Sequence, residues 1–479
     1  MPNSWNVTEV PWPESPAGAA RAYAGDGEVA WLDSAVDDAG ASNGARHSLV
    51  CARPLAVVEQ FEGRRATLRV GGRVVAEDAD GWRLWRAALA RMPAFPALSW
   101  GIGPGWVGYV GFEMARQLER LPARRHEDLG LPLTRVALYD RGIVLDHGKR
   151  RAFGVLARGV ANVLGRSERD EEWLERWALA AVNHVPLERW AASQLHYEMS
   201  RDTYERMIGR ALEYIAAGDI YQVNLAQRLR LAGVGDAWAL YAAVRRSNPA
   251  PYAALLSWDG GAVASFSPEM FLQVRGGRVL TRPIKGTRPR TGRTVEDEAR
   301  RRELLGSAKE AAELAMIIDL HRNDLGRVCE YGSVRVVHPR RVEAHPTVFH
   351  TVADVEGRLR TECDGLDLLR ACFPAGSVTG VPKIRALEII DELEPVARGV
   401  YTGAIGVLGF DGQMTFSVAI RTLQIRGEAA TLYVGGGIVA DSTSAAEYEE
   451  TLAKARGILA GIAADETQAA RCGRVMAES

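Results

Sequence analysis

The chain has 479 residues, and its 59 lysines and arginines are balanced by 60 acidic residues, which gives a formal net charge of −1. A chain built to hold polyanions usually carries a surplus of positive charge, so nucleic acid is disfavoured as the main partner. The hydrophobic fraction of 47% is typical of a folded protein with a sizeable core. At roughly 150 residues per domain, the length predicts about three structural units.

The cysteines and the N-terminus indicate a cytoplasmic protein. The five cysteines form no CxxC pair and have long spacings, which disfavours both a disulfide framework and a zinc site. The first residues, MPNSWNVTEVPWPESP, have neither the basic region nor the apolar core of a signal peptide. Because no apolar run approaches the length of a membrane span, we expect no association with a membrane.

The N-terminal part of the chain mixes short strands with one helical stretch. Strand-like runs occur at Ala66–Val70 and Val136–Tyr139, and a helical pattern occupies Trp82–Met92. Periodicity is weak around residues 184–200, which places the most plausible boundary between two parts of the chain there.

Three glycines in this part, Gly103, Gly105 and Gly108, match the GxGxxG pattern of dinucleotide-binding proteins. That function requires a buried strand directly before the glycines and a helix directly after them. Prolines interrupt the segment before the glycines, and a further glycine interrupts the segment after them. We therefore predict glycines of a loop and no Rossmann-type site.

Beyond the boundary the patterns sharpen. The stretch DTYERMIGRALEYIAAG predicts a helix with one apolar stripe, with Asp202 and Glu205 at capping-box spacing and Gly218 as its stop. Strand-like runs then come in clusters, which favours an α+β fold with largely antiparallel sheets over a doubly wound fold. These runs are Ala262–Ser265, Phe271–Val274, Val334–Val337, Ile405–Gly409, Thr415–Arg421 and Leu432–Val434.

Two helical stretches carry paired carboxylates. The segment KEAAELAMIIDLHRNDLG predicts a helix from about Ala308 to Leu320, apolar nearly all round beyond its first turn, with Glu310 and Glu313 on one face. A second predicted helix, in DSTSAAEYEETLAKARGILAGIA, carries Glu447 and Glu450 at the same spacing.

These carboxylates allow two interpretations. A buried carboxylate is costly unless it is paired or binds a metal, and an ion pair explains the first helix at least as well as a metal does. Ser444 and Glu447 also have the spacing of a capping box. Two buried helices could instead jointly hold Mg²⁺, which takes oxygen ligands and leaves room for water and substrate. Without histidine or cysteine nearby in sequence, zinc is a poor candidate.

Other residues suit an anionic small molecule. In TFSVAIRT, strand alternation places Ser417, Ala419 and Arg421 on one face, where the arginine could grip a carboxylate. The strand LYV then runs into Gly435–Gly437, whose backbone N–H groups could approach an anion. A tight turn and a salt-bridged arginine explain these features about equally well.

Eight short motifs follow one another along the chain: GDIYQVNLAQR, SPE, PIKGTRPR, MIIDLHRNDLG, FPAGSVTGVPK, YTGAIG, SVAIRT and GGGIVADSTSAAEYEET. In this order they resemble the chorismate-utilising enzymes, the family that includes component I of anthranilate synthase and of aminodeoxychorismate synthase. The resemblance spans roughly Ser200 to Ala464, with a looser N-terminal part. It implies two mostly antiparallel β-sheets packed as a sandwich and flanked by helices, with an N-terminal subdomain (1–195), a chorismate-binding catalytic region (196–465) and a C-terminal tail (466–479).

The resemblance also implies roles for individual residues. Chorismate is a dianion, and Mg²⁺ would take its ring carboxylate. Glu269 would be the general acid and Lys285 a nucleophile. The metal-binding residues would be Glu310, Glu313, Glu447 and Glu450, and the substrate-binding residues Gln222, Thr287, His350, Ser377, Tyr401, Arg421, Gly435, Gly436, Gly437 and Lys454.

Two positions indicate which nucleophile, water or ammonia, the enzyme would add to chorismate. Gln222 stands where water-using members of the family carry a lysine base, so the chain resembles the ammonia-using branch. Lys285 stands in PIKGT, the form of aminodeoxychorismate synthases, where anthranilate synthases typically have PIAGT; anthranilate synthase component I or another amine-adding enzyme is the alternative. A nucleophilic lysine must be neutral, and we expect Arg282, Arg288 and Mg²⁺ to lower its pKa.

The resemblance implies partners as well. The chain has no GxCxG-like element with a nucleophilic cysteine, so ammonia would come from a separate glutamine amidotransferase subunit. The product would serve p-aminobenzoate and folate synthesis. WLDSA (Trp31–Ala35) and NPAPY (Asn248–Tyr252) resemble elements that bind tryptophan in relatives, so tryptophan at a regulatory or structural site is a further candidate ligand.

Overall fold

The computed structural model describes residues 4–34, 46–164, 171–183, 194–345 and 348–462. Two large sheets dominate it, and every strand pairing among these residues is antiparallel. The prediction of an α+β fold with antiparallel sheets is therefore confirmed. No helix in the described ranges is both long and apolar enough to cross a membrane.

The first sheet contains strands from both parts of the chain. Its order is β1 (Trp5–Val10), β10 (Arg151–Ala157), β9 (Arg141–Asp146), β3 (His47–Ala52), β2 (Val29–Asp33), β13 (Tyr252–Trp258), β14 (Gly261–Ser267), β23 (Thr422–Arg426), β24 (Ala429–Ile438), β12 (Gln222–Ala232) and β11 (Gln194–Tyr197), with β20 (Gly380–Val381) paired to β12.

The second sheet is equally mixed. Its order is β17 (Ile284–Pro289), β19 (Val348–Arg358), β16 (Arg278–Thr281), β15 (Met270–Arg275), β22 (Met414–Val418), β21 (Ala404–Gly409), β7 (Gly105–Val110), β8 (Thr134–Leu138), β4 (Ala56–Gln60), β5 (Ala66–Val70) and β6 (Arg73–Asp78), with β18 (Arg335–Ala344) paired to β19.

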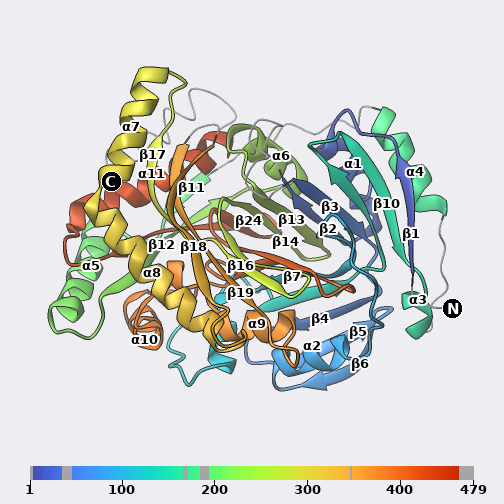
Figure 1. The fold of residues 1–479 in the computed structure, drawn as a ribbon, viewed down its shortest axis with the longest axis horizontal. Coiled ribbons are helices and arrows are strands. Elements are labelled where there is room, and N and C mark those ends of the chain that lie inside the picture. The colour runs from blue at the N-terminus through green and yellow to red at the C-terminus, as the bar shows by residue number, and fades with distance from the viewer. Residues whose placement is uncertain (1–3, 35–45, 165–170, 184–193, 346–347, 463–479) are drawn as a thin grey trace.

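Helices surround the two sheets, with the N-terminal strands β1 and β10 on one side of the molecule and α5, α8 and α10 on the other (Figure 1). They are α1 (Pro16–Arg21), α2 (Gly81–Leu89), α3 (Val160–Val163), α4 (Glu171–Val182), α5 (Arg201–Ala216), α6 (Ala237–Ser247), α7 (Thr294–Gly306), α8 (Ala308–Gly326), α9 (Gly365–Cys372), α10 (Lys383–Leu393) and α11 (Ser444–Ile462), with short 3-10 turns η1 (Ala24–Asp26), η3 (Phe112–Gln117) and η4 (Gly376–Val378).

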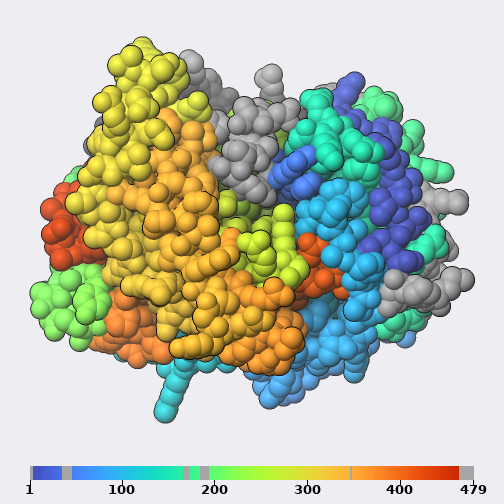
Figure 2. Space-filling model, viewed as in Figure 1, coloured from blue at the N-terminus to red at the C-terminus, as the bar shows by residue number. Residues whose placement is uncertain are grey.

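The sheets form a sandwich because most of their strands are apolar on both faces. A central cluster joins Ala30 and Leu49 of the first sheet to Val107 and Ile405 of the second. The opposite face of the first sheet packs against α1, α4, α6 and α11, and that of the second against α2, α8 and α9. In space-filling view, α7, α8 and β18 cover one side of the visible face of the molecule, and the N-terminal strands cover the opposite side (Figure 2). Double-sided burial explains why many strands have continuous apolar sequences.

Both sheets cross the boundary predicted from the sequence, since β2 pairs with β13 and β7 with β21. Residues 184–193 and the tail 466–479 lie outside the described residues. The division into 1–195, 196–465 and 466–479 therefore stays a prediction.

Some local predictions were wrong in detail. Helix α5 begins after Ser200, whose hydroxyl accepts a hydrogen bond from the Thr203 N–H, so Ser200 caps it and Asp202 does not. Gly105 and Gly108 lie in strand β7 and not in a loop. A Cβ on Gly105 would lie 2.3 Å from the Leu408 carbonyl oxygen, and one on Gly108 would lie 2.1 Å from that of Arg135. Close approach of neighbouring strands is the reason for these two glycines.

Candidate active site

The glycine run of β24 brings several predicted site residues together. A Cβ added to Gly437 would lie 2.8 Å from Gln222 Nε2 and 3.2 Å from Lys285 Nζ. One added to Gly436 would lie 2.9 Å from Glu447 Oε2, and one on Gly435 would lie 3.0 Å from the Tyr401 hydroxyl. Because Cβ directions alternate along a strand, side chains on Gly435 and Gly437 would enter one face of β24, and a side chain on Gly436 would meet Glu447 on the other.

These glycines belong to a strand and not to a turn. Gly435, Gly436 and Gly437 pair with Ala226, Leu225 and Asn224 of β12. On the other edge, β24 is paired with β23 only as far as Leu432. Because N–H groups alternate between the two edges of a strand, part of the glycine backbone remains free of the sheet and can meet an anion.

Glu269 lies between β14 and β15 and is 4% exposed. The Ser377 hydroxyl donates a hydrogen bond to its Oε1 at 2.6 Å. Burial raises the pKa of Glu269 to about 7, although Ser377, Lys285 and the Ile284 N–H favour the charged form. A carboxyl group with this pKa is half protonated near neutrality, so it can donate a proton there.

Lys285 lies on β17, opposite Thr351 of β19, and the Thr351 hydroxyl donates to its carbonyl oxygen. Burial lowers its pKa; the charge of Lys454 acts in the same direction, while Glu313, Glu269 and Glu450 oppose it. A lowered pKa increases the fraction of neutral, nucleophilic amine.

The predicted role of the two arginines was wrong. Arg282 pairs with Asp354 at 2.6 Å, and Arg288 pairs with Glu303 at 2.8 Å and with Glu310 at 2.9 Å. Their charges are compensated locally, so the positive charge that acts on Lys285 comes from Lys454.

Gln222 begins strand β12 and is fully buried. Within the described part of the chain, neither its amide oxygen nor its amide nitrogen has a hydrogen-bond partner. A buried amide without partners is costly, and here it lies beside Lys285 and Gly437. This pattern suits a polar ligand that supplies the missing bonds.

Arg421 lies in the connection from β22 to β23, with a φ of 52°. Strand β22 ends at Val418, so extending strand alternation to Arg421 was wrong. No carboxylate of the described residues pairs with it, and burial lowers its pKa. The salt-bridged alternative therefore fails for the described residues, and a guanidinium without a carboxylate partner suits an anionic ligand.

Two histidines lie near this arginine, and sequence reasoning missed one of them. His350 Nδ1 lies 2.9 Å from the Thr287 hydroxyl, and its ring centroid lies 5.2 Å from that of His345. Burial, followed by the charge of Arg421, lowers both pKa values, that of His345 to about 4. The Nε2 atoms of both rings are buried without hydrogen-bond partners in the described part of the chain, although His345 Nε2 lies 3.8 Å from Glu343 Oε2. Only spatial proximity reveals His345, because no motif contains it.

The four predicted metal ligands occupy the facing helices α8 and α11, which are less buried than the sequence suggested. Ala312, Ala315 and Asp319 expose one face of α8, and Glu450 is 54% exposed at its side chain. Glu447 accepts a hydrogen bond from Ser442 at 2.6 Å, so Ser442, and not the predicted Ser444, is its partner.

The charges of these carboxylates affect one another's pKa values. Burial raises the pKa of Glu313, and the charges of Glu450 and Glu310 raise it further. Burial and the charge of Glu450 likewise raise the pKa of Glu447. Glu310 Oε2 is buried without a partner among the described residues. The pKa of Glu450 is lowered instead, chiefly by the charge of Lys454. The oxygen donors of these carboxylates are the ligands that suit a hard cation such as Mg²⁺.

The side chains are not gathered around a single point in this arrangement. No three acidic, histidine or cysteine side chains of the described residues are placed to hold one ion. Glu310 pairs with Arg288, and Glu450 with Lys454 at 2.7 Å. Lys454 also donates to the Gly435 carbonyl at 2.8 Å.

The elements that resemble a tryptophan site also meet in the fold. Asp33 of WLDSA pairs with Ala253, directly after NPAPY, while Ala35 lies outside the described residues. A cavity of about 60 Å³ beside them is lined by His47, Trp100, Tyr252 and Arg275, among others. Asp33 itself is bonded to Arg245 at 2.6 Å and to the Tyr241 hydroxyl at 3.0 Å.

The chain is similar to known proteins both in sequence and in fold. The family described as chorismate binding enzyme matches residues 41–460. Aminodeoxychorismate synthase component 1 of Klebsiella aerogenes is 41% identical over 86% of this chain and 90% of its own length. Anthranilate synthase component 1 of Thermus thermophilus is also 41% identical, over 78% of this chain and 80% of its own length. The crystal structure of anthranilate synthase component I from Streptococcus pneumoniae superposes with a TM-score of 0.75 at 31% identity, covering 86% of this chain and 92% of that one.

The chain therefore belongs to the chorismate binding enzymes. Within that class it is similar both to aminodeoxychorismate synthase component 1 and to anthranilate synthase component 1.

Proposed function

We propose that the chain is component I of an aminodeoxychorismate synthase, which replaces the C4 hydroxyl of chorismate with an amine. The observation that carries this proposal is Lys285, whose Nζ lies beside Gly437 and Gln222 and whose pKa is lowered by burial. A neutral lysine at this point can act as a nucleophile toward the substrate ring.

The proposed reaction has two displacements. Glu269 gives its proton to the C4 hydroxyl while the Lys285 amine bonds to C2; both ring double bonds move by one position and water leaves. Ammonia then bonds to C4, both double bonds move back and the lysine leaves as a neutral amine. The Glu269 carboxylate takes the excess proton from the new ammonium group, which restores the acid. Two displacements place the amine at C4, whereas one direct addition at C2 would give the ortho product.

The remaining residues hold the dianionic substrate. Arg421, Tyr401 and the free edge of Gly435–Gly437 would hold the enolpyruvyl carboxylate, with His350, Thr287, Ser377, Gln222 and Lys454 as further contacts. Mg²⁺, held by Glu313 and Glu450 with support from Glu310 and Glu447, would neutralise the ring carboxylate when bound. The proximity of Gln222, Lys285 and Tyr401 to the glycines of β24 supports this assignment.

Ammonia would come from a glutamine amidotransferase, which the designation "component 1" of the relatives supports. The product would enter p-aminobenzoate and folate synthesis in the cytoplasm. The cavity beside Asp33 and Tyr252 is the proposed place for tryptophan.

Anthranilate synthase component I is the second candidate, because a relative with that name is equally identical. The two functions differ in product. The purified chain, given chorismate, Mg²⁺ and ammonium, should form p-aminobenzoate only after an aminodeoxychorismate lyase is added. Formation of anthranilate and pyruvate without the lyase would exclude the proposed function.

A further inference from the structure

Arg398 is the most completely bonded buried charge of the described residues, and it lies just behind the substrate-facing groups. Its side chain is 1% exposed and forms an ion pair at 2.6 Å with Glu394, the residue that follows α10. The guanidinium lies 4.6 Å from the centre of the Phe112 ring and 5.7 Å from that of Tyr401.

All five N–H groups of this guanidinium are used. Nε and one Nη2 hydrogen bond to the two oxygens of Glu394, at 2.9 and 2.6 Å. The other Nη2 hydrogen bonds to the Asn224 carbonyl at 2.6 Å. The Nη1 hydrogens bond to the Val378 carbonyl and to the Thr402 hydroxyl, both at 3.1 Å. A lysine offers three donors without the planar fork, so it cannot reproduce this pattern.

The three acceptors other than Glu394 lie within two residues of the proposed site along the chain. Asn224 lies two residues after Gln222, Val378 follows Ser377, and Thr402 follows Tyr401. Glu394 Oε1 also accepts the Ala226 N–H at 2.9 Å, which ties the pair to β12 a second time. One side chain thus connects three separate segments that present groups to the substrate.

The bond to Thr402 stabilises an unusual backbone. Thr402 has a φ of 59°, a conformation that β-branched residues rarely adopt. Its hydroxyl donates to the Tyr401 carbonyl at 2.6 Å while accepting from Arg398, and its N–H donates to the Ala419 carbonyl at 2.8 Å. These bonds fix the direction in which Tyr401 points.

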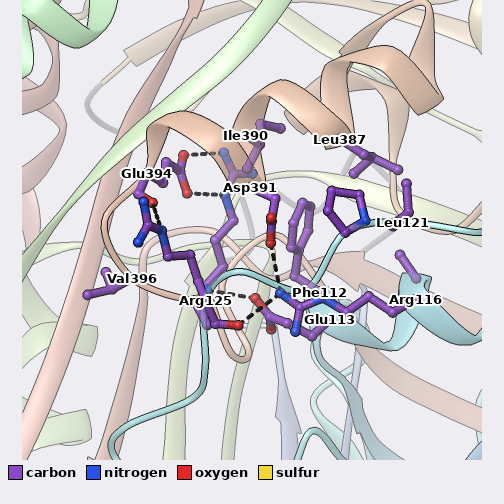
Figure 3. A pocket seen from close by; sticks show the side chains of 14 residues that line it. Phe112, Glu113, Arg116, Leu121, Arg125, Leu387, Ile390, Asp391, Glu394 and Val396 are labelled. Carbon is purple, nitrogen blue, oxygen red and sulfur yellow. Dashed lines mark hydrogen bonds and ion pairs between the residues drawn. The ribbon is translucent and has the colours of Figure 1, made fainter.

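The N-terminal part of the chain holds Arg398 from the other side. Glu113 of η3 accepts the N–H groups of Arg398 and Gly399, at 2.8 and 3.0 Å. Figure 3 shows Glu113 and Arg116 on one side of a pocket, and Asp391 of α10 and the following Glu394 on the other.

We infer that Arg398 is a positioning residue for the chorismate site, which sets Tyr401, the Ser377 turn and the start of β12 relative to one another. It touches neither Lys285 nor Glu269 by any bond in the described residues, so it acts through these segments. The expected effect on kcat/KM rests on the proposed function, whereas the expected effect on the order of these segments does not.

The test compares Arg398→Lys with Arg116→Lys. Arg116 lines the same pocket but bonds to Glu62, Asp391 and the Arg125 carbonyl, none of which belongs to the proposed site. Displacement of catalytic groups by about 1 Å can cost about 100-fold, so we expect Arg398→Lys to lower kcat/KM for chorismate by roughly 10- to 100-fold. Arg116→Lys should leave it within about twofold, and both should keep the wild-type circular dichroism.

Two further readouts separate positioning from general stabilisation. Combined with Tyr401→Phe, the loss caused by Arg398→Lys should be smaller than the product of the single losses, because both act through Tyr401. Amide hydrogen exchange at residues 376–379 and 400–403 should rise in Arg398→Lys and stay unchanged in Arg116→Lys. If Arg398→Lys does not fold, the isosteric Thr402→Val, which removes one acceptor, should raise exchange at residues 400–403.

The outcomes are distinguishable. Wild-type exchange and wild-type kcat/KM in Arg398→Lys would overturn the inference, as would an equal loss in Arg116→Lys. A wild-type chain that does not consume chorismate would refute the proposed function, and the exchange measurements would still decide whether Arg398 positions these segments.

Discussion

Replacing Ser377 with alanine should move the proton equilibrium of Glu269 in a predictable direction. The Ser377 hydroxyl bonds to Glu269 Oε1 at 2.6 Å in a buried site, and it stabilises the carboxylate form. A hydrogen bond to a charged group contributes about 1.5–3 kcal/mol, which corresponds to about 1–2 pKa units. Without it, the pKa of Glu269 should rise from about 7 to roughly 8–9.

The assay is the pH dependence of kcat/KM for chorismate, measured at constant free ammonia because ammonium itself titrates at alkaline pH. A general acid must be protonated, so wild-type kcat/KM should fall as the pH rises through about 7. In Ser377→Ala this fall should begin about 1–2 pH units higher, even if the absolute rate is lower. At pH 8 roughly one tenth of Glu269 is protonated in the wild type, against about half or more in the variant.

Ser417 offers a matched control. It is also a buried serine, but its hydroxyl bonds to the Ile405 carbonyl at 3.2 Å. Ser417→Ala should therefore leave the alkaline limb in place, and Glu269→Gln should remove both the limb and most of the activity. A limb that stays fixed or moves to lower pH in Ser377→Ala would refute the assignment of Glu269 as the acid.

Three further predictions concern other parts of the molecule. Lys285→Ala should lose most para-amination while its melting temperature stays close to wild type; unchanged activity would remove the covalent role. Glu313→Gln should raise the Mg²⁺ concentration needed for half-maximal activity and reduce the stabilisation that Mg²⁺ gives in a melting experiment, whereas an unchanged Mg²⁺ response would remove Glu313 from the metal site. Burial raises the pKa of Glu113 to about 7, above its ordinary value of 4.5, so the folded state binds this proton more tightly than the unfolded state. The free energy of unfolding should thus lose about 3 kcal/mol as the pH rises from about 4.5 to about 7, and Glu113→Gln should lack that loss in urea titrations; the same slope in the variant would contradict it.

Much of the fold was predictable because strand and helix periodicities are local. Runs such as Ala66–Val70 and Ile405–Gly409 are strands in the structure, and the helix predicted at Ala308 begins there. Where a strand ends is less local: β22 stops at Val418 because the chain turns toward β23, and Arg421 takes a left-handed conformation that alternation cannot foresee.

The site was predictable only where a motif carries it. Lys285 and Glu269 stand in short motifs, and burial shifts the pKa of each in the direction that the proposed chemistry requires. The charge that acts on Lys285 was misassigned because ion pairs such as Arg282 with Asp354, 72 residues apart, are tertiary. Arg398 and His345 were not predicted from the sequence, because their contacts are also tertiary. Arg398, for example, bonds to Asn224 across 174 residues.

The most direct test of the account is whether Lys285 becomes covalently attached to substrate. Wild-type protein incubated with chorismate and Mg²⁺, without ammonium, should be digested and its peptides mapped by mass spectrometry. The peptide with Lys285 should gain the mass of chorismate less one water, and adding ammonium should remove the adduct. If no adduct forms on Lys285 while the same preparation aminates chorismate at C4 once ammonium is supplied, the proposed covalent role of Lys285 is wrong.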